Sequence, residues 1–371
     1  MVRVIKSLQR GGMLVGSLPK GCQLCTRGSK LVLFVTGLCT SSCFYCPVSE
    51  RKIGRDLIFA DELPVSTDDD VLYEAEAIGA EGAGMSGGDP LCRLERTEHF
   101  IRLLKERNGK EFHIHLYTSQ SDADESVMRR LKEAGLDEIR FHPQCSDWSA
   151  IEAAVRLGMS VGLELPVIPG RIDSLIEAAS RAEQMGLSFM NINELEASET
   201  NFARMTERGM RLASMDSASI EGSARDARSL LEWATTGLRR LTVHYCSAGF
   251  KDSVQMRNRL QRRMERTRRE FEVADDTEPL LVLGVVRAPH GKSLSEEELS
   301  TISRVLTEGL QVPREMINID QIRSRLEIAP WILEEVAEDL RHALPGPMNI
   351  EIGIAQEYPT WDRFQTLFEP L

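Results

Sequence analysis

The sequence predicts an α/β protein built from repeated βαβ units. Two observations lead to this expectation. Short apolar runs rich in β-branched residues alternate with amphipathic helical stretches six times between residues 30 and 196. A helical stretch at 223–235 and one further strand at 241–245 follow. Because strands that alternate with helices in this way pair in parallel, the chain is expected to form a parallel sheet covered by helices.

The predicted elements follow one another in a regular order. The first strand is the apolar run at 31–35, which is too short to span a membrane. An extended piece at 57–64 precedes a helix that ends near Ile78. The stretch Ser66-Thr-Asp-Asp-Asp is expected to supply the N-cap and an acidic first turn of this helix. A glycine-rich stretch occupies residues 82–91. The remaining helix and strand pairs are expected at 95–106 and 112–119, 125–134 and 138–143, 148–157 and 160–170, and 172–185 and 188–196.

The composition is that of an ordinary globular protein. Apolar residues make up 42% of the 371 residues, and charged residues make up 27%. No apolar run reaches about 18 residues and no signal-like leader is present, so a cytoplasmic protein without a membrane span is expected. The net charge of −12 argues against a general nucleic-acid coat. Eight cysteines in such a chain indicate metal or redox chemistry rather than a disulfide framework.

Three cysteines follow the first strand on a short loop. Cys39, Cys43 and Cys46 have the spacing C-x3-C-x2-C, which allows three thiolates to bind one iron–sulfur cluster. The next residues contain no fourth cysteine or histidine, so one coordination position is left for another ligand. A structural zinc loop is the alternative, but such sites are normally closed by a fourth protein ligand.

With the aromatic Tyr45 before its last cysteine, this loop resembles the signature of the radical S-adenosylmethionine (radical SAM) enzymes. A second motif, Ser86-Gly87-Gly88-Asp89-Pro90, follows one βα unit later and is similar to the Gly-Gly-Glu/Asp-Pro turn of that family. Asp89 stands where glutamate is commoner. The resemblance covers residues 20–250 and is greatest to the archaeal-type branch related to pyruvate formate-lyase activating enzymes.

The resemblance implies an open (β/α)6 partial TIM barrel and a set of cofactors. The three cysteines would hold a [4Fe-4S] cluster, and S-adenosylmethionine would chelate its fourth iron. One electron would then cleave S-adenosylmethionine to a 5′-deoxyadenosyl radical that abstracts a substrate hydrogen. Tyr45 would pack near the adenine, and Ser86, Gly87, Gly88 and Asp89 would orient the methionyl end.

Further site residues are expected where parallel strands end, because ligands bind at the carboxyl ends of barrel strands. By analogy with the family, His142 or Arg140, together with Glu164, would hold the ribose and carboxylate of S-adenosylmethionine. Arg140 could equally be a surface residue, since it alternates with apolar neighbours. The same rule nominates a wider set at the barrel mouth: Thr118, Ser119, Asn191, Asn193, Glu194 and Glu196.

A second metal site is also predicted. Cys22 and Cys25 form a C-x2-C pair, a spacing that chelates metal well. Cys246, with His244 as a candidate fourth ligand, would complete an iron–sulfur or zinc site, and similarity to archaeal-type sequences favours grouping these three cysteines. The alternative is a pair of thiols in a turn and a buried cysteine. The remaining two, Cys92 and Cys145, are expected to be buried small hydrophobic residues.

The domain organisation expected from these features has four parts. Residues 1–29 form an N-terminal extension with the C-x2-C pair, 30–246 the radical SAM partial barrel, 247–276 a basic helix and 277–371 a small α/β domain. In the last part, strands are expected at 280–287 and 348–354, and a helix at 295–310 capped by Ser293. Arginines of the basic helix could contact RNA phosphates, but local pairing with the abundant acidic residues is the favoured interpretation.

The substrate is left open by the sequence. Activation of a glycyl-radical protein, modification of a tRNA base, and modification of a peptide or metabolite are the alternatives within this class. An electron donor such as ferredoxin or flavodoxin is expected as a partner. The competing hypothesis from another class is a non-catalytic iron–sulfur or zinc protein that uses the same scaffold for binding.

Overall fold

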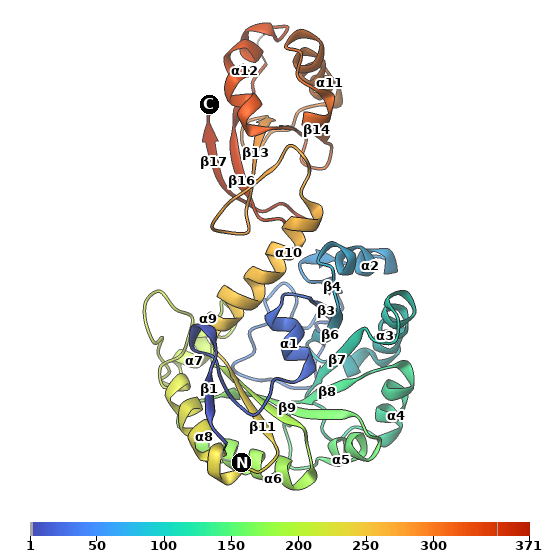
Figure 1. The fold of residues 1–371 in the computed structure, drawn as a ribbon, viewed down its shortest axis with the longest axis vertical. Coiled ribbons are helices and arrows are strands. Elements are labelled where there is room, and N and C mark those ends of the chain that lie inside the picture. The colour runs from blue at the N-terminus through green and yellow to red at the C-terminus, as the bar shows by residue number, and fades with distance from the viewer. Residues whose placement is uncertain (1–2, 347) are drawn as a thin grey trace. The chain divides into compact units, whose positions relative to one another are not determined.

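The computed structural model describes residues 3–346 and 348–371 (Figure 1). The chain divides into two compact units, Met1–Arg259 and Leu260–Leu371, so the cysteine-containing extension lies in the same unit as the barrel. Every helix in the described ranges is too short or too polar to pass through a lipid bilayer.

The first unit contains a sheet whose central strands are all parallel, which confirms the predicted α/β partial barrel. Its parallel strands lie side by side in chain order. They are β3 (Lys30–Thr36), β6 (Gly82–Gly87), β7 (His113–Thr118), β8 (Glu138–Phe141), β9 (Ser160–Val167), β10 (Phe189–Glu194) and β11 (Thr242–Cys246).

Antiparallel strands extend this sheet at both edges, and the barrel is therefore open. On one side β3 pairs with β4 (Phe59–Ala60), which pairs with β5 (Leu63–Pro64). On the other side β11 pairs with β2 (Met13–Val15), which pairs with β1 (Ile5–Ser7). The two strands of the N-terminal extension thus belong to the barrel sheet.

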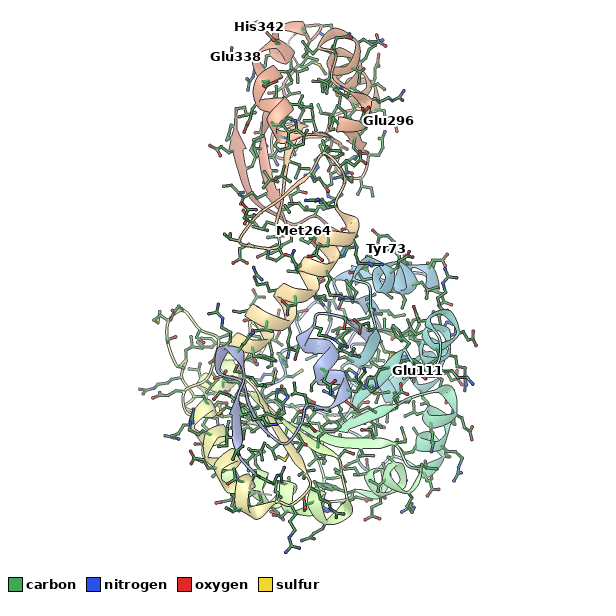
Figure 2. The ribbon with its side chains drawn as sticks, in the orientation of Figure 1. Tyr73, Glu111, Met264, Glu296, Glu338 and His342 are labelled. Carbon is green, nitrogen blue, oxygen red and sulfur yellow. The ribbon has the colours of Figure 1, made fainter. Side chains whose placement is uncertain are left out.

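Helices cover the outer face of the parallel sheet (Figure 1). Thr67, which lies in the stretch expected to supply the cap, caps the first of them, because the Thr67 side chain and Asp70 form a reciprocal capping box. The covering helices are α2 (Asp68–Ala77), α3 (Leu94–Asn108), α4 (Glu125–Ala134), α5 (Ser149–Arg156), α6 (Ile172–Met185) and α8 (Ser223–Gly237). Tyr73 of α2 lies on the exposed side of these helices (Figure 2).

The hydrophobic core lies between the strands and the helices, whereas the barrel interior is polar. On β7, Ile114 and Leu116 are fully buried in the same apolar cluster as Leu131 of α4. The alternate β7 positions carry His113, which is 9% exposed, and His115, which is fully buried. Successive side chains of a strand point to opposite faces, so these histidines face the interior of the barrel. A buried polar interior of this kind must satisfy its own hydrogen bonds and charges.

Helix α1 (Lys20–Thr26) packs against β6 and β7 and carries both cysteines of the C-x2-C pair. Its close approach depends on Gly21. A Cβ atom at this position would lie 2.6 Å from a guanidinium nitrogen of Arg140 and 2.7 Å from Nδ1 of His115. The missing side chain therefore allows α1 to place Cys22 beside the polar interior.

The second unit contains an antiparallel sheet with strand order β14-β15-β13-β16-β17, and β12 (Val273–Ala274) also pairs with β13. The predicted pairing of its first and last expected strands is confirmed, since β13 (Leu281–Arg287) pairs with β16 (Glu351–Glu357). The other strands were not predicted; they are β14 (Ile317–Asp320), β15 (Arg325–Ile328) and β17 (Gln365–Pro370).

Two α-helices, α11 (Glu296–Arg304) and α12 (Pro330–Ala343), pack on this sheet. Ser295 caps α11 through a capping box, so the predicted cap at Ser293 is wrong. The exposed face of α12 carries Glu338 and His342 (Figure 2).

The expected basic helix is formed by a one-turn helix α9 (Ala248–Phe250), a π-helical segment (Lys251–Met256) and α10 (Arg257–Thr267). Two arginines of the predicted basic stretch pair with nearby carboxylates. Arg259 of α10 pairs with Asp61 and Glu62, and Arg269, which follows the end of α10, pairs with Glu272 and Glu327. This pairing matches the favoured interpretation of the basic stretch.

Candidate functional site

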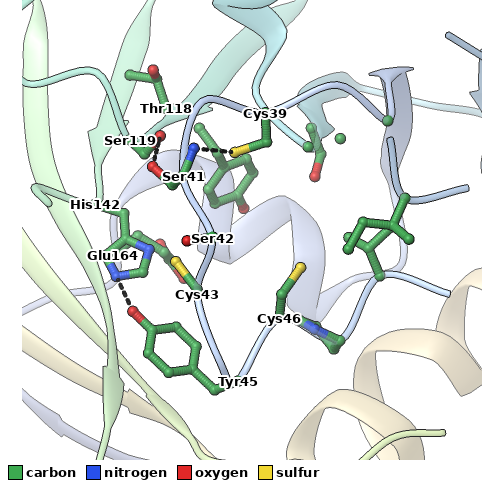
Figure 3. Close-up of a pocket in the computed structure, with 18 of the residues that line it drawn as sticks. Cys39, Ser41, Ser42, Cys43, Tyr45, Cys46, Thr118, Ser119, His142 and Glu164 are labelled. Carbon is green, nitrogen blue, oxygen red and sulfur yellow. Dashed lines mark hydrogen bonds between the residues drawn. The ribbon is translucent and has the colours of Figure 1, made fainter. Parts of the chain in front are cut away.

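A cavity of about 370 Å³ opens at the carboxyl ends of the strands (Figure 3). It brings together nine of the ten residues predicted to hold the cluster or S-adenosylmethionine. They are Cys39, Cys43, Cys46, Tyr45, Ser86, Gly87, Gly88, His142 and Glu164. The cavity is also lined by Arg140 and by Tyr117 from β7.

The cysteines lie on the loop between β3 and β4, which is closed on itself by backbone hydrogen bonds. The amide of Gly37 donates to the carbonyl of Arg55 at 2.8 Å, and the amide of Gly54 donates to the carbonyl of Gly37 at 2.8 Å. Figure 3 shows the side chains of the three cysteines among the residues that line the cavity. All three are free thiols, so they are available as ligands.

The donor set and its spacing fit an iron–sulfur cluster. Among the described residues, His113, His115 and Glu138 form the group whose ligand atoms all lie within 4.8 Å of one another. The sulfurs of Cys39, Cys43 and Cys46 do not form such a group, so at least two of them are farther apart than 4.8 Å. A tetrahedral zinc ion with bonds of about 2.3 Å would need sulfurs about 3.8 Å apart. Thiolate ligands at wider spacing suit a cluster of several iron atoms.

The glycine turn packs directly on the cysteine loop. The amide of Gly88 donates to the carbonyl of Thr36 at 2.8 Å, and the amide of Asp89 donates to the carbonyl of Leu38 at 2.7 Å. A Cβ atom on Gly88 would lie 2.3 Å from the carbonyl oxygen of Leu38. The backbone of the turn can therefore line the cavity only because this position has no side chain.

Replacing Gly88 by alanine is expected to weaken binding of S-adenosylmethionine by tenfold or more, about 1.4 kcal/mol, because the turn must move away from the loop. The iron content should remain that of the wild type, since no ligand is lost. Equilibrium dialysis with S-adenosylmethionine and iron quantitation would test both expectations. Gly109→Ala is the matched control, because Gly109 has nothing within 4 Å of an added Cβ. Unchanged binding in Gly88→Ala would contradict the prediction.

Asp89, the tenth predicted residue, lies behind the cavity wall and is fully buried. Its carboxylate accepts hydrogen bonds from the hydroxyl of Thr118 at 3.0 Å and from the amide and hydroxyl of Ser119 at 2.9 and 2.8 Å. It also accepts one from the amide of Leu91 at 3.0 Å. Asp89 therefore ties the turn after β6 to the end of β7, and a role toward S-adenosylmethionine stays a prediction.

Tyr45 and His142 form one side of the cavity. The phenol oxygen of Tyr45 lies 2.9 Å from Nε2 of His142, and the two rings stack with centroids 5.8 Å apart (Figure 3). Burial lowers the pKa of His142 to about 4, so its imidazole is neutral near pH 7. A flat pair of uncharged rings offers a stacking surface for a planar group such as an adenine.

Two residues of the segment after β10 support this part of the site and were not predicted. The side-chain amide of Asn201 donates to the carbonyl of Tyr45 at 3.0 Å, and Arg204 donates to the carbonyl of Cys43 at 3.4 Å. Arg204 also lines the cavity. They come from irregular backbone and a short helix, α7 (Phe202–Thr206), so no periodic pattern marks them in the sequence.

Arg140 and Glu164 form the floor of the cavity. Arg140 is only 2% exposed and lines the cavity, so it is not the surface residue that the sequence also allowed. Its guanidinium lies 3.2 Å from Glu164, and Glu164 also accepts from the amides of Asn191 at 2.8 Å and Asn193 at 2.7 Å. Burial acts to raise the pKa of Glu164, but Arg140 and the two amides outweigh it and hold this pKa below its usual value.

The residues of the predicted second site also lie together. Cys22, Cys25, Cys246 and His244 line a cavity of about 150 Å³ inside the barrel. The amide of Asn191 lies 3.3 Å from the sulfur of Cys22. Tyr117, Arg140 and Glu164 line this cavity as well as the larger one, so they form a common wall. Cys145 is exposed and Cys92 is half-buried, so neither is the buried residue expected.

The wider set nominated at the barrel mouth divides by position. Ser119 lines the larger cavity with Thr118, and Asn191 and Asn193 line the smaller one. The two glutamates instead hold the segment after β11. Glu194 accepts from the amide of Ala248 at 2.8 Å, and Glu196 pairs with Lys251.

The buried histidines predict a pH dependence of stability. Burial, together with the charges of Arg140 and Lys30, holds the pKa of His115 well below its usual value of about 6.5. The unfolded chain therefore binds the extra proton first, and stability falls as the pH drops below about 6.5. From pH 7.5 to 5.5 this residue should cost about 1.4 kcal/mol. Urea unfolding at the two pH values should show a loss smaller by this amount in His115→Gln, and an equal loss in both proteins would contradict the assignment.

Comparisons with known proteins place the chain in a family. A family model described as the radical SAM superfamily matches residues 33–156, and a domain of unknown function (DUF8061) matches residues 280–371. A proposed glycyl-radical enzyme activating enzyme (MJ0021) of Methanocaldococcus jannaschii is 32% identical over 369 residues, covering 95% of this chain and 93% of that protein. A PqqA peptide cyclase of Granulibacter bethesdensis is 28% identical over 136 residues, covering 36% of this chain and 33% of that protein.

The solved structures that match are more distant. SuiB of Streptococcus suis bound to S-adenosylmethionine matches with a TM-score of 0.41 and 11% identity, over 61% of this chain and 53% of that one. Methylornithine synthase matches with a TM-score of 0.40 and 14% identity, over 57% of this chain and 63% of that one. The match therefore spans a little over half of each of these proteins.

The archaeal relative is similar along almost the whole chain, and the superfamily model matches the segment that carries the cysteine loop and the glycine turn. The chain therefore belongs to the radical SAM superfamily and is an enzyme that cleaves S-adenosylmethionine reductively at a [4Fe-4S] cluster.

Proposed function

We propose that Cys39, Cys43 and Cys46 hold the catalytic [4Fe-4S] cluster and that S-adenosylmethionine binds in the cavity they share with Gly87 and Gly88. The observation that carries this assignment is the direct packing of the glycine turn on the cysteine loop. Three thiols from one loop leave one iron without a protein ligand, and the backbone of the turn lies at the same cavity. When bound, such a cluster would supply the electron that cleaves S-adenosylmethionine to methionine and a 5′-deoxyadenosyl radical, which would abstract a hydrogen atom from the substrate.

The remaining cavity residues are assigned by their chemistry. The neutral ring pair of Tyr45 and His142 stacks against the adenine. Glu164 stays ionised and accepts hydrogen bonds from ribose hydroxyls, while Arg140 offers a cation to a carboxylate. Ser86 lies in the wall beside the glycines. The chain thus binds and orients the reacting groups and separates them from bulk water.

The test of this function is formation of 5′-deoxyadenosine by the reconstituted enzyme. The full-length protein would be reconstituted with iron and sulfide without oxygen and mixed with dithionite and S-adenosylmethionine. Stoichiometric 5′-deoxyadenosine and methionine are expected, together with a change in the EPR signal of the reduced cluster when S-adenosylmethionine is added. A protein that binds iron but leaves S-adenosylmethionine intact under these conditions would overturn the proposal.

The substrate that the comparisons favour is a protein, with hydrogen abstraction from a glycine Cα. The support is the likeness of nearly the whole chain to a relative described as a glycyl-radical enzyme activating enzyme. The expected hydrogen transfer can be followed with a library of peptides that carry glycine deuterated at Cα. Deuterium should appear in 5′-deoxyadenosine for at least one peptide, and mass spectrometry would detect it. Formation of 5′-deoxyadenosine with no deuterium from any peptide would direct attention to another substrate class.

An electron donor such as ferredoxin or flavodoxin is proposed to replace dithionite in the physiological reaction. Photoreduced flavodoxin or reduced ferredoxin, supplied in place of dithionite, should support 5′-deoxyadenosine formation. A reaction that proceeds with dithionite and fails with both proteins would remove this class of donor.

We also propose that Cys22, Cys25 and Cys246 hold a second metal centre, an iron–sulfur cluster or zinc. Its support is that all three cysteines line one interior cavity. Cys25 and Cys246 lie more than 200 residues apart in the sequence. The test is metal quantitation on a Cys39/Cys43/Cys46→Ala variant. Iron or zinc that remains bound supports the second centre, and a variant without either metal would contradict it.

A further inference from the structure

His244 lies beside the three cysteines of the smaller cavity and has no hydrogen-bond partner. The residue is 1% exposed, and neither of its ring nitrogens has a partner among the residues that the structure describes. Leaving a buried polar group unsatisfied costs about 1–3 kcal/mol. This imidazole lines the same cavity as three thiols, and a metal bound to one of its ring nitrogens would supply the missing partner.

The backbone places His244 and Cys246 on the same side of β11. They are two positions apart on one strand, and alternate residues of a strand face the same way. The other two cysteines reach the cavity from α1, which Gly21 allows to approach the interior. Four ligands of the kinds that iron and zinc prefer thus come from two elements with fixed backbones.

The spacing of the sulfurs favours a cluster over a single ion. Cys22, Cys25 and Cys246 are not among the described groups whose ligand atoms all lie within 4.8 Å of one another. Gln255 spans part of the separation. Its Oε1 lies 2.9 Å from the sulfur of Cys25, and its Nε2 lies 3.4 Å from the sulfur of Cys246. A single zinc ion would require sulfurs about 3.8 Å apart, whereas a cluster of several iron atoms suits sulfurs held farther apart.

The cavity places cations beside the thiols. Lys30, Arg140 and Lys251 line it together with Glu164. Arg140 also pairs with Glu138, and Lys251 pairs with Glu196. The sulfur of Cys22 lies 3.5 Å from the guanidinium of Arg140. A cluster bound by three thiolates carries net negative charge, and buried cations stabilise it without the need for water.

From these observations we propose that His244 is the fourth protein ligand of an iron–sulfur cluster held by Cys22, Cys25 and Cys246. The inference rests on the second metal centre proposed above and makes it a closed site, with every iron bound by the protein. A closed cluster has no iron to which substrate could bind. It takes up one electron from a low-potential reductant such as dithionite and returns one electron on oxidation, and its position behind Arg140 places it next to the S-adenosylmethionine cavity.

The experiment uses the full chain with Cys39, Cys43 and Cys46 replaced by alanine, so that only the second site can hold iron. After anaerobic reconstitution and reduction, about four iron atoms should remain. Pulsed EPR on protein labelled with ¹⁵N-histidine should show a coupling from a bound imidazole. His244→Cys supplies a thiolate in its place and should keep the iron while losing that coupling. His244→Ala should lower the iron content to half or less.

His99→Ala is the matched control, because His99 is exposed, pairs with Asp68 and does not line the cavity. Iron content and histidine coupling should both be unchanged in it. A coupling that is absent from the parent, or that persists in His244→Cys, would overturn the assignment of His244. Bound zinc or no bound metal in the parent would overturn the second cluster altogether. Neither result would bear on the assignment of the catalytic cluster, which is tested separately by 5′-deoxyadenosine formation in the wild type.

Discussion

Replacing Cys43 by alanine is expected to reduce 5′-deoxyadenosine formation by about a thousandfold or more, equivalent to about 4 kcal/mol of activation free energy. The cysteine is one of three thiols that line the larger cavity, and the loop offers no other cysteine to replace it. Two thiolates cannot hold three irons of a cluster while leaving the fourth for S-adenosylmethionine. The measurement is chromatography of the anaerobic reaction with dithionite, alongside the iron content of the variant.

The matched control for this loss is Cys145→Ala. Cys145 is exposed, and it does not belong to the residues that line either cysteine-containing cavity. Its replacement should leave both 5′-deoxyadenosine formation and iron content at the wild-type level. Wild-type activity in Cys43→Ala, or an equal loss in both variants, would contradict the assignment of the cysteine loop to the catalytic centre.

Replacing Arg140 by methionine is expected to destabilise the barrel by about 3–5 kcal/mol, because it leaves buried carboxylates without their cation. Arg140 contacts Glu138 at 2.7 Å and Glu164 at 3.2 Å, and Glu138 is only 1% exposed. Methionine keeps much of the side-chain volume, so the loss reports charge rather than a cavity. Urea unfolding followed by circular dichroism would measure it.

Two further proteins make this result specific. Arg129→Met removes an arginine that pairs with Glu125 on the surface, and its unfolding midpoint should stay close to that of the wild type. Arg140→Met combined with Glu138→Gln should recover part of the lost stability, because one unpaired charge is gone. A single Arg140→Met variant as stable as the wild type would show that the interior charges do not depend on this residue.

The cysteine loop could be identified as a candidate cluster site because its information is local. Cys39, Cys43 and Cys46 lie within eight residues, and a spacing on one short loop is enough to indicate convergence. The glycine turn was recognisable for the same reason. Its packing on the loop through Leu38 could not be predicted, since backbone hydrogen bonds between distant segments leave no mark in residue types.

The polar interior was harder to read from the sequence. Charged residues that alternate with apolar ones occur in strands with one face in solvent. They also occur in strands that face a polar barrel interior, so the sequence did not decide whether Arg140 is exposed or buried. The same ambiguity hid β15, where Arg325 and Glu327 are buried as a pair. Cys145 was wrongly expected inside, because a cysteine's burial depends on the loop that carries it rather than on its own hydrophobicity.

The two backbone bonds between the glycine turn and the cysteine loop have a mechanical consequence. Gly88 and Asp89 donate to carbonyls on either side of Gly37, so the two segments are joined at neighbouring points. Thermal displacement of the loop must then carry the turn with it. The spacing between the sulfurs and the backbone of the glycine turn can stay constant even when both move relative to the barrel. Electron transfer over a short gap depends steeply on distance, and such a coupled pair would keep that gap fixed without requiring the whole cavity to be rigid.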